Sequence, residues 1–320
     1  MDPQTTDADE ANAISYHGKT GELFRIYLVN IALTILTLGI YRFWARTRIR
    51  DYLWSQTSFR GDRFEYTGVG KELFLGFLVV FVVIVAVSLA YQALYTVVAL
   101  QWPDFEILLQ LLALAATLVL IGVALYRARR YRLSRTRWRG IRGAQTGSAL
   151  GFGLRRFGYI LLTLLTLGFY WPFMNVRLLA FSLDNTWFGD RRFRFDGRGR
   201  DLLKPFAVVW LLFVPTLGLS WFFYRAAVLR YCANHTRYEN LRFAAEVALR
   251  PLAMLLFTNM LLRLLTLGLA YPVVLVRSAR FLCEHLRIVG DQDFAEIGQS
   301  LAAVPGRGEG LAAVLDVGEI

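Results

Sequence analysis

The chain has 320 residues, of which 56% are hydrophobic and 19% are charged, and its formal net charge is +12. Soluble domains average roughly 45–50% apolar and ~25% charged residues. This composition, with a mean hydropathy of +0.43, therefore argues against a soluble globular domain. Two cysteines, Cys232 and Cys283, are too few for a disulfide framework.

The two ends of the chain are more polar than its centre. The acidic start carries no basic stretch ahead of an apolar one, so we expect no cleavable signal peptide and a disordered polar tail over residues 1–20. The Gly- and Ala-rich residues 299–320 predict a flexible C-terminal tail. Residues 21–298 between them form a single membrane domain in this interpretation.

Two long stretches in the first half of the chain lack any charged residue. They are Leu73–Leu100 and Ile107–Tyr126. An apolar run of about 18 residues or more is typical of a transmembrane helix. A helix of a soluble core would show a polar face, and these stretches show none. We therefore predict two transmembrane helices here.

Four other apolar segments are interrupted by the tripeptide Thr-Leu-Gly. The segments are 25–43, 157–176, 205–224 and 251–276, and the predicted helix breaks are at Gly39, Gly168, Gly218 and Gly268. Glycine tolerates the backbone angles of a sharp turn, so each segment is predicted to be a re-entrant or V-shaped helix pair. The alternative is six kinked spans, which would place one Arg-rich loop on the outer side of the membrane.

Internal repetition is the most informative feature of the sequence. Leu-Thr-Leu-Gly recurs at 36–39, 165–168 and 265–268, with an arginine nine residues after each glycine. A second repeat type alternates with the first. The predicted units span about 21–69, 70–148, 149–198, 199–246 and 247–298.

Short alternating segments between the units predict β-hairpins. Residues 57–66 and 186–195 alternate apolar and polar side chains around a Gly-Asp pair, a hairpin pattern, although irregular loops are the alternative. Isolated hairpins are marginal in water, so we expect them to pair with one another or lie at the membrane surface. The predicted fold class is an all-α membrane protein of repeated transmembrane and broken or re-entrant helices, with short cytoplasmic β-hairpins.

Arginine supplies nearly all of the positive charge, and it flanks the apolar segments. Excess Lys and Arg mark cytoplasmic loops, so the Arg-rich loops are predicted to be cytoplasmic. A nucleic-acid partner is not expected, because no basic face belongs to a soluble domain. Basic segments beside membrane helices attract anionic headgroups. The candidate lipid-headgroup contacts are Arg48, Arg177, Arg277, Arg191, Arg192 and Arg194.

The repeated motifs resemble a known family. Leu36–Arg46 and Gly61–Gly68 are similar to the YjgN-like bacterial inner-membrane proteins, and Leu165–Phe173 with Phe193–Gly197 repeats the resemblance. The third copy departs from the pattern at Asp291–Phe294. The resemblance implies a multi-pass protein of the bacterial inner membrane. It implies no activity, because the family is of unknown function.

The sequence contains few candidate catalytic residues. There are three histidines, and neither Cys232 with His235 nor Cys283 with His285 has a usual zinc-ligand spacing. Nucleophilic catalysis needs a nucleophile, a base and an orienting group, and candidates for such a set are almost absent. We therefore predict no enzymatic activity, no metal and no cofactor.

Arg263 is the most notable charge within an apolar segment. Ionisable residues inside membranes are costly and often functional, so Arg263 with Asn259 could face a cavity and meet a phosphate or a lipid headgroup. Alternatively, Arg263 extends to the membrane interface. Asn30 holds the place of Asn259 in the first unit, which suggests a shared interhelical hydrogen bond.

These features favour a membrane protein of transport or lipid handling, because repeats with interrupted helices are common among transporters. The alternative is a structural or regulatory membrane protein whose Arg-rich hairpins bind anionic lipid or a cytoplasmic partner. No residue pattern specifies a substrate or an oligomeric state.

Overall fold

The computed structural model describes residues 14–290, 294 and 296–299, so most of both predicted tails lies outside the described residues. The tail predicted over residues 1–20 includes residues that have regular structure. Ile14–Tyr16 forms strand β1, and the first helix begins at Thr20. At the other end, the Gln299 side chain donates to the carbonyl of Gly140 and accepts from the backbone N–H of Arg142.

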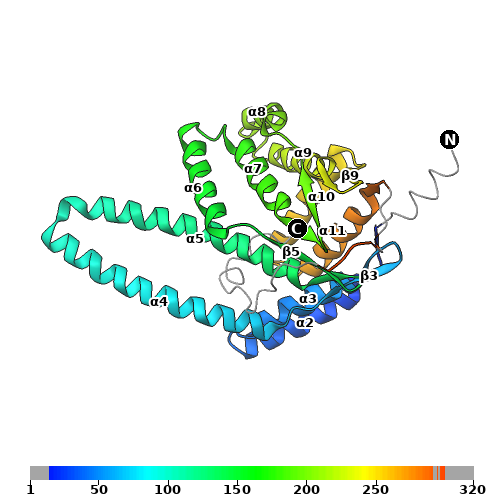
Figure 1. The fold of residues 1–320 in the computed structure, drawn as a ribbon, viewed down its shortest axis with the longest axis horizontal. Helices are drawn as coiled ribbons and strands as arrows, with labels where there is room; N and C mark the ends of the chain where they lie inside the picture. Colours follow the sequence, from blue (N-terminus) through cyan, green and yellow to red (C-terminus); the bar gives the residue numbers. More distant parts are fainter. Residues whose placement is uncertain (1–13, 291–293, 295, 300–320) are drawn as a thin grey trace.

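The helices of the described chain form five pairs, and each pair is joined by a short turn (Figure 1). The pairs are α2 (Thr20–Leu36) with α3 (Arg42–Ser55), α4 (Gly70–Gln101) with α5 (Glu106–Arg135), α6 (Ala149–Leu165) with α7 (Trp171–Asp184), α8 (Leu203–Leu212) with α9 (Ser220–Asn234), and α10 (Leu249–Leu265) with α11 (Tyr271–His285). Two short 3-10 helices, η1 (Pro103–Phe105) and η2 (Gly199–Leu202), precede α5 and α8.

The α4–α5 pair is much longer than the others and projects beyond them in Figure 1. α4 has 32 residues, and at ~1.5 Å per residue it is about 48 Å long, enough to cross a bilayer. Only 11% of the most apolar part of either helix is buried inside the molecule. A core helix of a soluble protein would be covered, so these exposed apolar surfaces suit lipid. In the described chain, these two helices have the length and composition of membrane spans.

The other four pairs turn at Thr-Leu-Gly. In the first, the N–H of Gly39 donates to the carbonyl of Thr34 at 2.7 Å and that of Leu38 donates to Ile35 at 3.1 Å. This is the Schellman pattern of a helix C-terminus, with a left-handed residue after the cap. The Thr37 hydroxyl also accepts the N–H of Tyr41, which fixes the start of the next helix. The same bonds recur around Gly168, Gly218 and Gly268.

The strands form one sheet, so the predicted all-α fold with separate short hairpins is wrong. The described strands are β1 (Ile14–Tyr16), β2 (Thr57–Phe59), β3 (Asp62–Tyr66), β4 (Thr136–Trp138), β5 (Ile141–Gln145), β6 (Thr186–Phe188), β7 (Arg191–Phe195), β8 (Thr236–Tyr238), β9 (Leu241–Ala245) and β10 (Leu286–Val289). Each strand pairs antiparallel with the next one in sequence. The two predicted hairpins, β2–β3 and β6–β7, are joined through β4 and β5 and do not pair directly.

The sheet encloses an aromatic core. All ten described strands contribute a side chain to one cluster, which centres on Trp138, with an exposed fraction of 2%. Neighbouring strands lie ~4.8 Å apart, so a flat sheet of this size would be too wide for one cluster, and the sheet must curl. Phe294, near the C-terminus, lies edge-on to Trp138, with ring centroids 4.9 Å apart.

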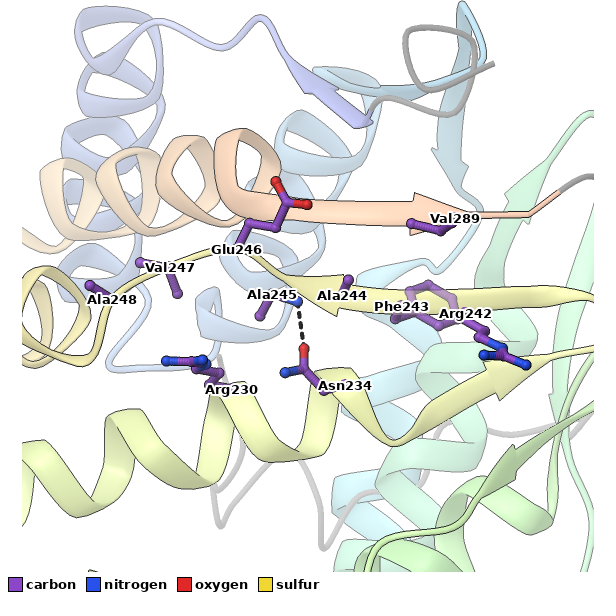
Figure 2. Close-up of a pocket in the computed structure, with 10 residues that line it drawn as sticks. All are labelled: Arg230, Asn234, Arg242, Phe243, Ala244, Ala245, Glu246, Val247, Ala248 and Val289. Carbon is purple, nitrogen blue, oxygen red and sulfur yellow. Dashed lines mark hydrogen bonds between the residues drawn. The ribbon is translucent and has the colours of Figure 1, made fainter. Parts of the chain in front are cut away.

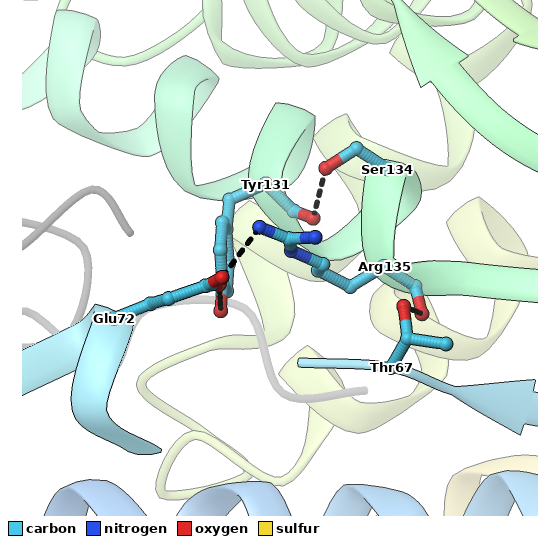
Figure 3. Close-up of polar contacts among 5 residues, drawn as sticks. All are labelled: Thr67, Glu72, Tyr131, Ser134 and Arg135. Atoms are coloured by element: carbon cyan, nitrogen blue, oxygen red, sulfur yellow. Dashed lines mark hydrogen bonds and ion pairs between the residues drawn. The ribbon is translucent and has the colours of Figure 1, made fainter. Parts of the chain in front are cut away.

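Three of the five helix pairs meet the sheet through a junction of polar side chains. At the base of α4–α5, Glu72 accepts a hydrogen bond from Tyr131 at 2.8 Å and pairs with Arg135 at 2.7 Å (Figure 3). The N–H of Thr67, just after β3, donates to the carbonyl of Arg135 and joins the sheet to the same network.

In this junction, the residue type in the first helix of a pair goes together with the residue type in the second helix. Tyr52 donates to Glu22 at the base of α2–α3, and Tyr231 donates to Asp201 at the base of α8–α9. Where Gly151 and Pro251 replace the acid, Phe181 and Phe281 replace the tyrosine. A tyrosine therefore appears only in the pairs whose first helix turn supplies an acceptor for its hydroxyl.

Candidate anion-binding pocket

The first and last helix pairs pack against each other. Leu23, Tyr52 and Leu53 form one buried cluster with Leu275 and Val276. Near the turns, the Tyr27 hydroxyl donates to the carbonyl of Gly268 at 3.1 Å, and its ring lies 5.9 Å from that of Tyr271. This contact brings Arg263 beside α2 and α3.

A pocket of about 500 Å³ lies at this junction. Three arginines line it: Arg42 and Arg46 from the first turns of α3, and Arg263 from the last turn of α10. No carboxylate is found among the described residues of its lining, and the rest of the wall is aliphatic, aromatic or neutral polar. The charged side chains of this described lining are therefore all cationic, which suits an anion.

Aromatic rings hold two of these guanidinium groups. Arg42 lies over the rings of Phe43 and Phe77, at 5.0 and 5.4 Å, and Arg263 lies over the ring of Tyr271 at 5.3 Å. A guanidinium that stacks on a ring keeps the N–H groups of its edge available for hydrogen bonds. The planar fork of such a group matches the oxygens of a phosphate or carboxylate.

The two predicted asparagines each bridge their own helix pair. The Nδ2 of Asn30 donates from α2 to the carbonyl of Ala45 on α3, at 3.4 Å. The Nδ2 of Asn259 donates from α10 to the hydroxyl of Ser278 on α11, at 3.0 Å. Both side chains are buried, and the Oδ1 of each has no partner among the described groups. Asn30 lines the pocket with Arg263, whereas Asn259 is not part of its wall.

The other predicted site residues lie elsewhere. Arg48 stacks on Tyr41, Arg177 bonds to the Tyr170 hydroxyl, and Arg277 bonds to Thr258 on the neighbouring helix. All three are exposed. Arg191, Arg192 and Arg194 lie on β7 in the sheet. The predicted residues therefore do not form a single site: Arg263, Asn30 and the predicted break Gly268 come together, and the others lie apart.

Sequence reasoning missed Arg42 and Arg46. Both follow a predicted helix break, where an arginine looks like one more of the basic residues that flank the apolar segments. Their spacing of four residues carries the signal, since residues i and i+4 share one face of a helix. The structure places that face toward Arg263, a neighbour that is distant in sequence.

Exposed apolar helices of spanning length, joined to shorter helix pairs by an antiparallel sheet, are the features of a helical membrane protein. The chain belongs to the family described as "bacterial protein of unknown function (DUF898)", which matches residues 11–223 and 203–314. The predicted family resemblance is thereby confirmed.

Curated relatives share a segment of the chain. The "Inner membrane protein YjgN" of Salmonella typhimurium is 39% identical over 79 residues, which cover 24% of this chain and 20% of the relative. The proteins of that name from Escherichia coli O157:H7 and K12 are 38% and 37% identical, over 22% and 21% of this chain and 17% of each relative. The matched segment thus spans about a fifth or less of these relatives. No solved structure matches the chain.

Proposed function

We propose that this protein resides in the bacterial inner membrane and holds an anionic phospholipid by its headgroup in the pocket of Arg42, Arg46 and Arg263. The relatives' printed name supports the location. The proposed topology is multi-pass, with α4 and α5 as the two spans and the sheet in the cytoplasm. Four arginines near the end of α5, from Arg127 to Arg132, fit the excess of basic residues on the cytoplasmic side.

The single sheet supports a topology in which all the Arg-rich loops lie on the same side of the membrane. Strands from every loop are hydrogen-bonded into the same layer, which a bilayer running between them would interrupt. The similar turns and junctions of the helix pairs also support an internally repeated architecture, in which the α4–α5 unit carries an insertion. On this basis the four short pairs enter the membrane from the cytoplasmic side and return.

The depth of the short pairs follows from their common junctions. Gly39 lies 13 residues before Tyr52, and Leu118 lies equally far before Tyr131. Leu118 is eight residues beyond Tyr126, where the charge-free part of α5 ends, which is ~12 Å along a helix. The hydrocarbon core is ~30 Å thick, so turns at this level would lie within the near leaflet.

The turns themselves carry an apolar side chain that suits lipid. Leu38, Leu217 and Leu267 are 94–95% exposed, and Leu167 is 80% exposed. Each has a φ of 49°, a left-handed conformation that glycine adopts at lower cost. An exposed leucine in a strained backbone conformation would not stabilise a turn that faces water. Inside a leaflet, its burial contributes roughly 1.5–3 kcal/mol.

The pocket lies at the same level as these turns, and this is the observation that carries the proposal. Arg263 is five residues from Gly268, and the charged residues of the described lining are arginines. A phospholipid satisfies both parts of this surface. Its phosphate binds the guanidinium groups, while its acyl chains lie along the leucines of the turns. A free anionic solute satisfies only the first part, so lipid handling is favoured over solute transport.

Lipid retention tests the proposal directly. We would purify the full chain in detergent, add phosphatidylglycerol or phosphatidylethanolamine, and measure bound lipid by native mass spectrometry. Charge-assisted hydrogen bonds contribute about 1.5–3 kcal/mol, so Arg42→Gln with Arg263→Gln should weaken phosphatidylglycerol binding by roughly 10- to 100-fold. Arg48→Gln is the matched control, because Arg48 stacks on a ring in the same way but lies outside the pocket. Equal binding of both lipids, or equal losses in both variants, would contradict the proposal.

A further inference from the structure

The outer face of the sheet carries arginines in directly opposed positions. Arg194 on β7 faces Arg237 on β8, and Arg237 faces Arg242 on β9. All three are exposed. Like charges directly opposite one another on neighbouring strands destabilise a sheet. Arg137 on β4 has one partner of each sign, since it faces Glu65 on β3 and Arg142 on β5.

The charges of this row are only partly compensated. Arg237 pairs with Asp196, and Arg191 lies near Asp190 and Glu239. Arg192, Arg194 and Arg242 have no ion pair or side-chain hydrogen bond within the portion of the chain that the structure covers. These three guanidinium groups, two on β7 and one on β9 on the other side of β8, form a positive row, which we call the arginine row.

A groove continues the arginine row at one end. It has a volume of about 590 Å³ and lies between α9, β9 and the end of β10 (Figure 2). Arg230 and Arg242 stand at its two ends, and Ala244, Val247 and Val289 supply apolar surface. The groove is not an unfilled strand position, because the backbone N–H of Ala245 already donates to Asn234 at 2.7 Å.

The groove results from one small side chain. Ala245 occupies the place held by Tyr66 at the end of β3 and by Phe195 at the end of β7. A large ring at this point covers the space beside the strand in those units: Phe195, for example, reaches Gly197. Alanine leaves this space open, and Arg230 and Arg242 flank it.

We propose that the arginine row and the adjoining groove bind an acidic, extended peptide segment of a partner protein. Carboxylates of the segment would pair with Arg192, Arg194 and Arg242, while a small apolar side chain would enter the groove. A single-stranded nucleic acid fits this face less well, because such binding relies on exposed rings for base stacking. Here Phe193 and Phe243 pack into the core, and Trp187 donates to Thr146.

The first test uses a fluorescein-labelled peptide of twelve alternating Glu and Ala residues and the full chain in lipid nanodiscs. Fluorescence anisotropy should show binding that weakens as salt is raised. Arg192→Gln with Arg194→Gln and Arg242→Gln should weaken it at least tenfold. Arg63→Gln is the matched control, since Arg63 is exposed on β3 and outside the row. A similar loss in this control would overturn the proposal.

Two further variants separate binding from folding. Arg194→Thr removes a like-charge repulsion, so it should raise the melting temperature while it weakens peptide binding; a variant that merely misfolds would lower both. Ala245→Phe should fill the groove and weaken binding with no change in charge. Tighter binding of an oligothymidylate of twelve nucleotides than of the peptide would contradict the proposed partner. Undiminished peptide binding by Ala245→Phe would contradict it as well.

Discussion

The α4–α5 pair and the α2–α3 pair begin and end alike but differ in everything between. Both rise from a strand through an acid–tyrosine contact, Glu72 with Tyr131 in one and Glu22 with Tyr52 in the other. α2 then ends after 17 residues at a Thr-Leu-Gly turn, whereas α4 continues for 32. The comparison teaches that the junction with the sheet sets the architecture, while helix length alone decides which pair can cross a bilayer.

The largest expected effect comes from breaking the junction of the long pair. Glu72→Ala leaves Arg135 and the Tyr131 hydroxyl without their acceptor, and both side chains are largely covered. Removing one partner of a buried pair costs about 3–5 kcal/mol, and partial exposure reduces this to ~2–3 kcal/mol. Thermal unfolding in detergent measures it. Glu22→Ala is the comparison and should cost less, because Glu22 is more exposed. Equal losses would show that the two junctions are equivalent.

Next is the crossing of α5 with α6, which anchors the long pair. A Cβ added at Gly153 would lie 2.6 Å from the carbonyl oxygen of Val119, so the helices would have to separate. Overpacking costs about 1–3 kcal/mol, and we expect Gly153→Ala to lose ~2 kcal/mol of unfolding free energy. Gly158, on the same helix, has open space around it. Gly158→Ala should be neutral or slightly stabilising, and a loss there would point to a general intolerance of α6.

A smaller effect is expected at the turns of the short pairs. Leu38→Gly relieves a left-handed leucine and should raise stability in detergent by up to about 1 kcal/mol. The same change should reduce quenching of a nearby fluorophore by brominated lipid, because an apolar contact with the leaflet is lost. If stability rises and quenching is unchanged, the turn does not lie in lipid.

The smallest effect concerns the two natural thiols. Burial raises the pKa of Cys232 and of Cys283 to about 11. Because the thiolate is the reactive form, alkylation by iodoacetamide at pH 7 should be slow and should become faster as the pH is raised. Rapid labelling at pH 7 would show that the helix ends beside the sheet open readily.

Part of this fold is local and could be predicted. The charge-free runs specify α4 and α5, and Thr-Leu-Gly specifies the sharp turns, because the Thr37 hydroxyl and the Gly39 N–H act within one helix end. The sheet could not be predicted in the same way. Its strands have three to five residues, and a pairing such as Tyr66 with Thr136 joins positions separated by two whole helices.

The candidate site also has a part that could be predicted locally and a part that depends on long-range packing. Arg263 and Asn30 are conspicuous on their own, since polar side chains are rare in apolar segments. Arg42 and Arg46 become pocket residues only when the last helix pair packs against the first, through Tyr27 and Gly268. No pattern within one unit contains that information.

Accessibility in intact cells tests the central claim most directly, which is that only α4–α5 crosses the membrane. Single cysteines at Gln101, Arg192 and Leu267, in a chain lacking Cys232 and Cys283, would be labelled with an impermeant thiol reagent added outside the inner membrane. All three positions are exposed, so protein burial does not limit the reaction. We predict labelling at Gln101 alone. Labelling at Arg192 or Leu267 would place the sheet or a short turn on the outer side and contradict the proposed topology.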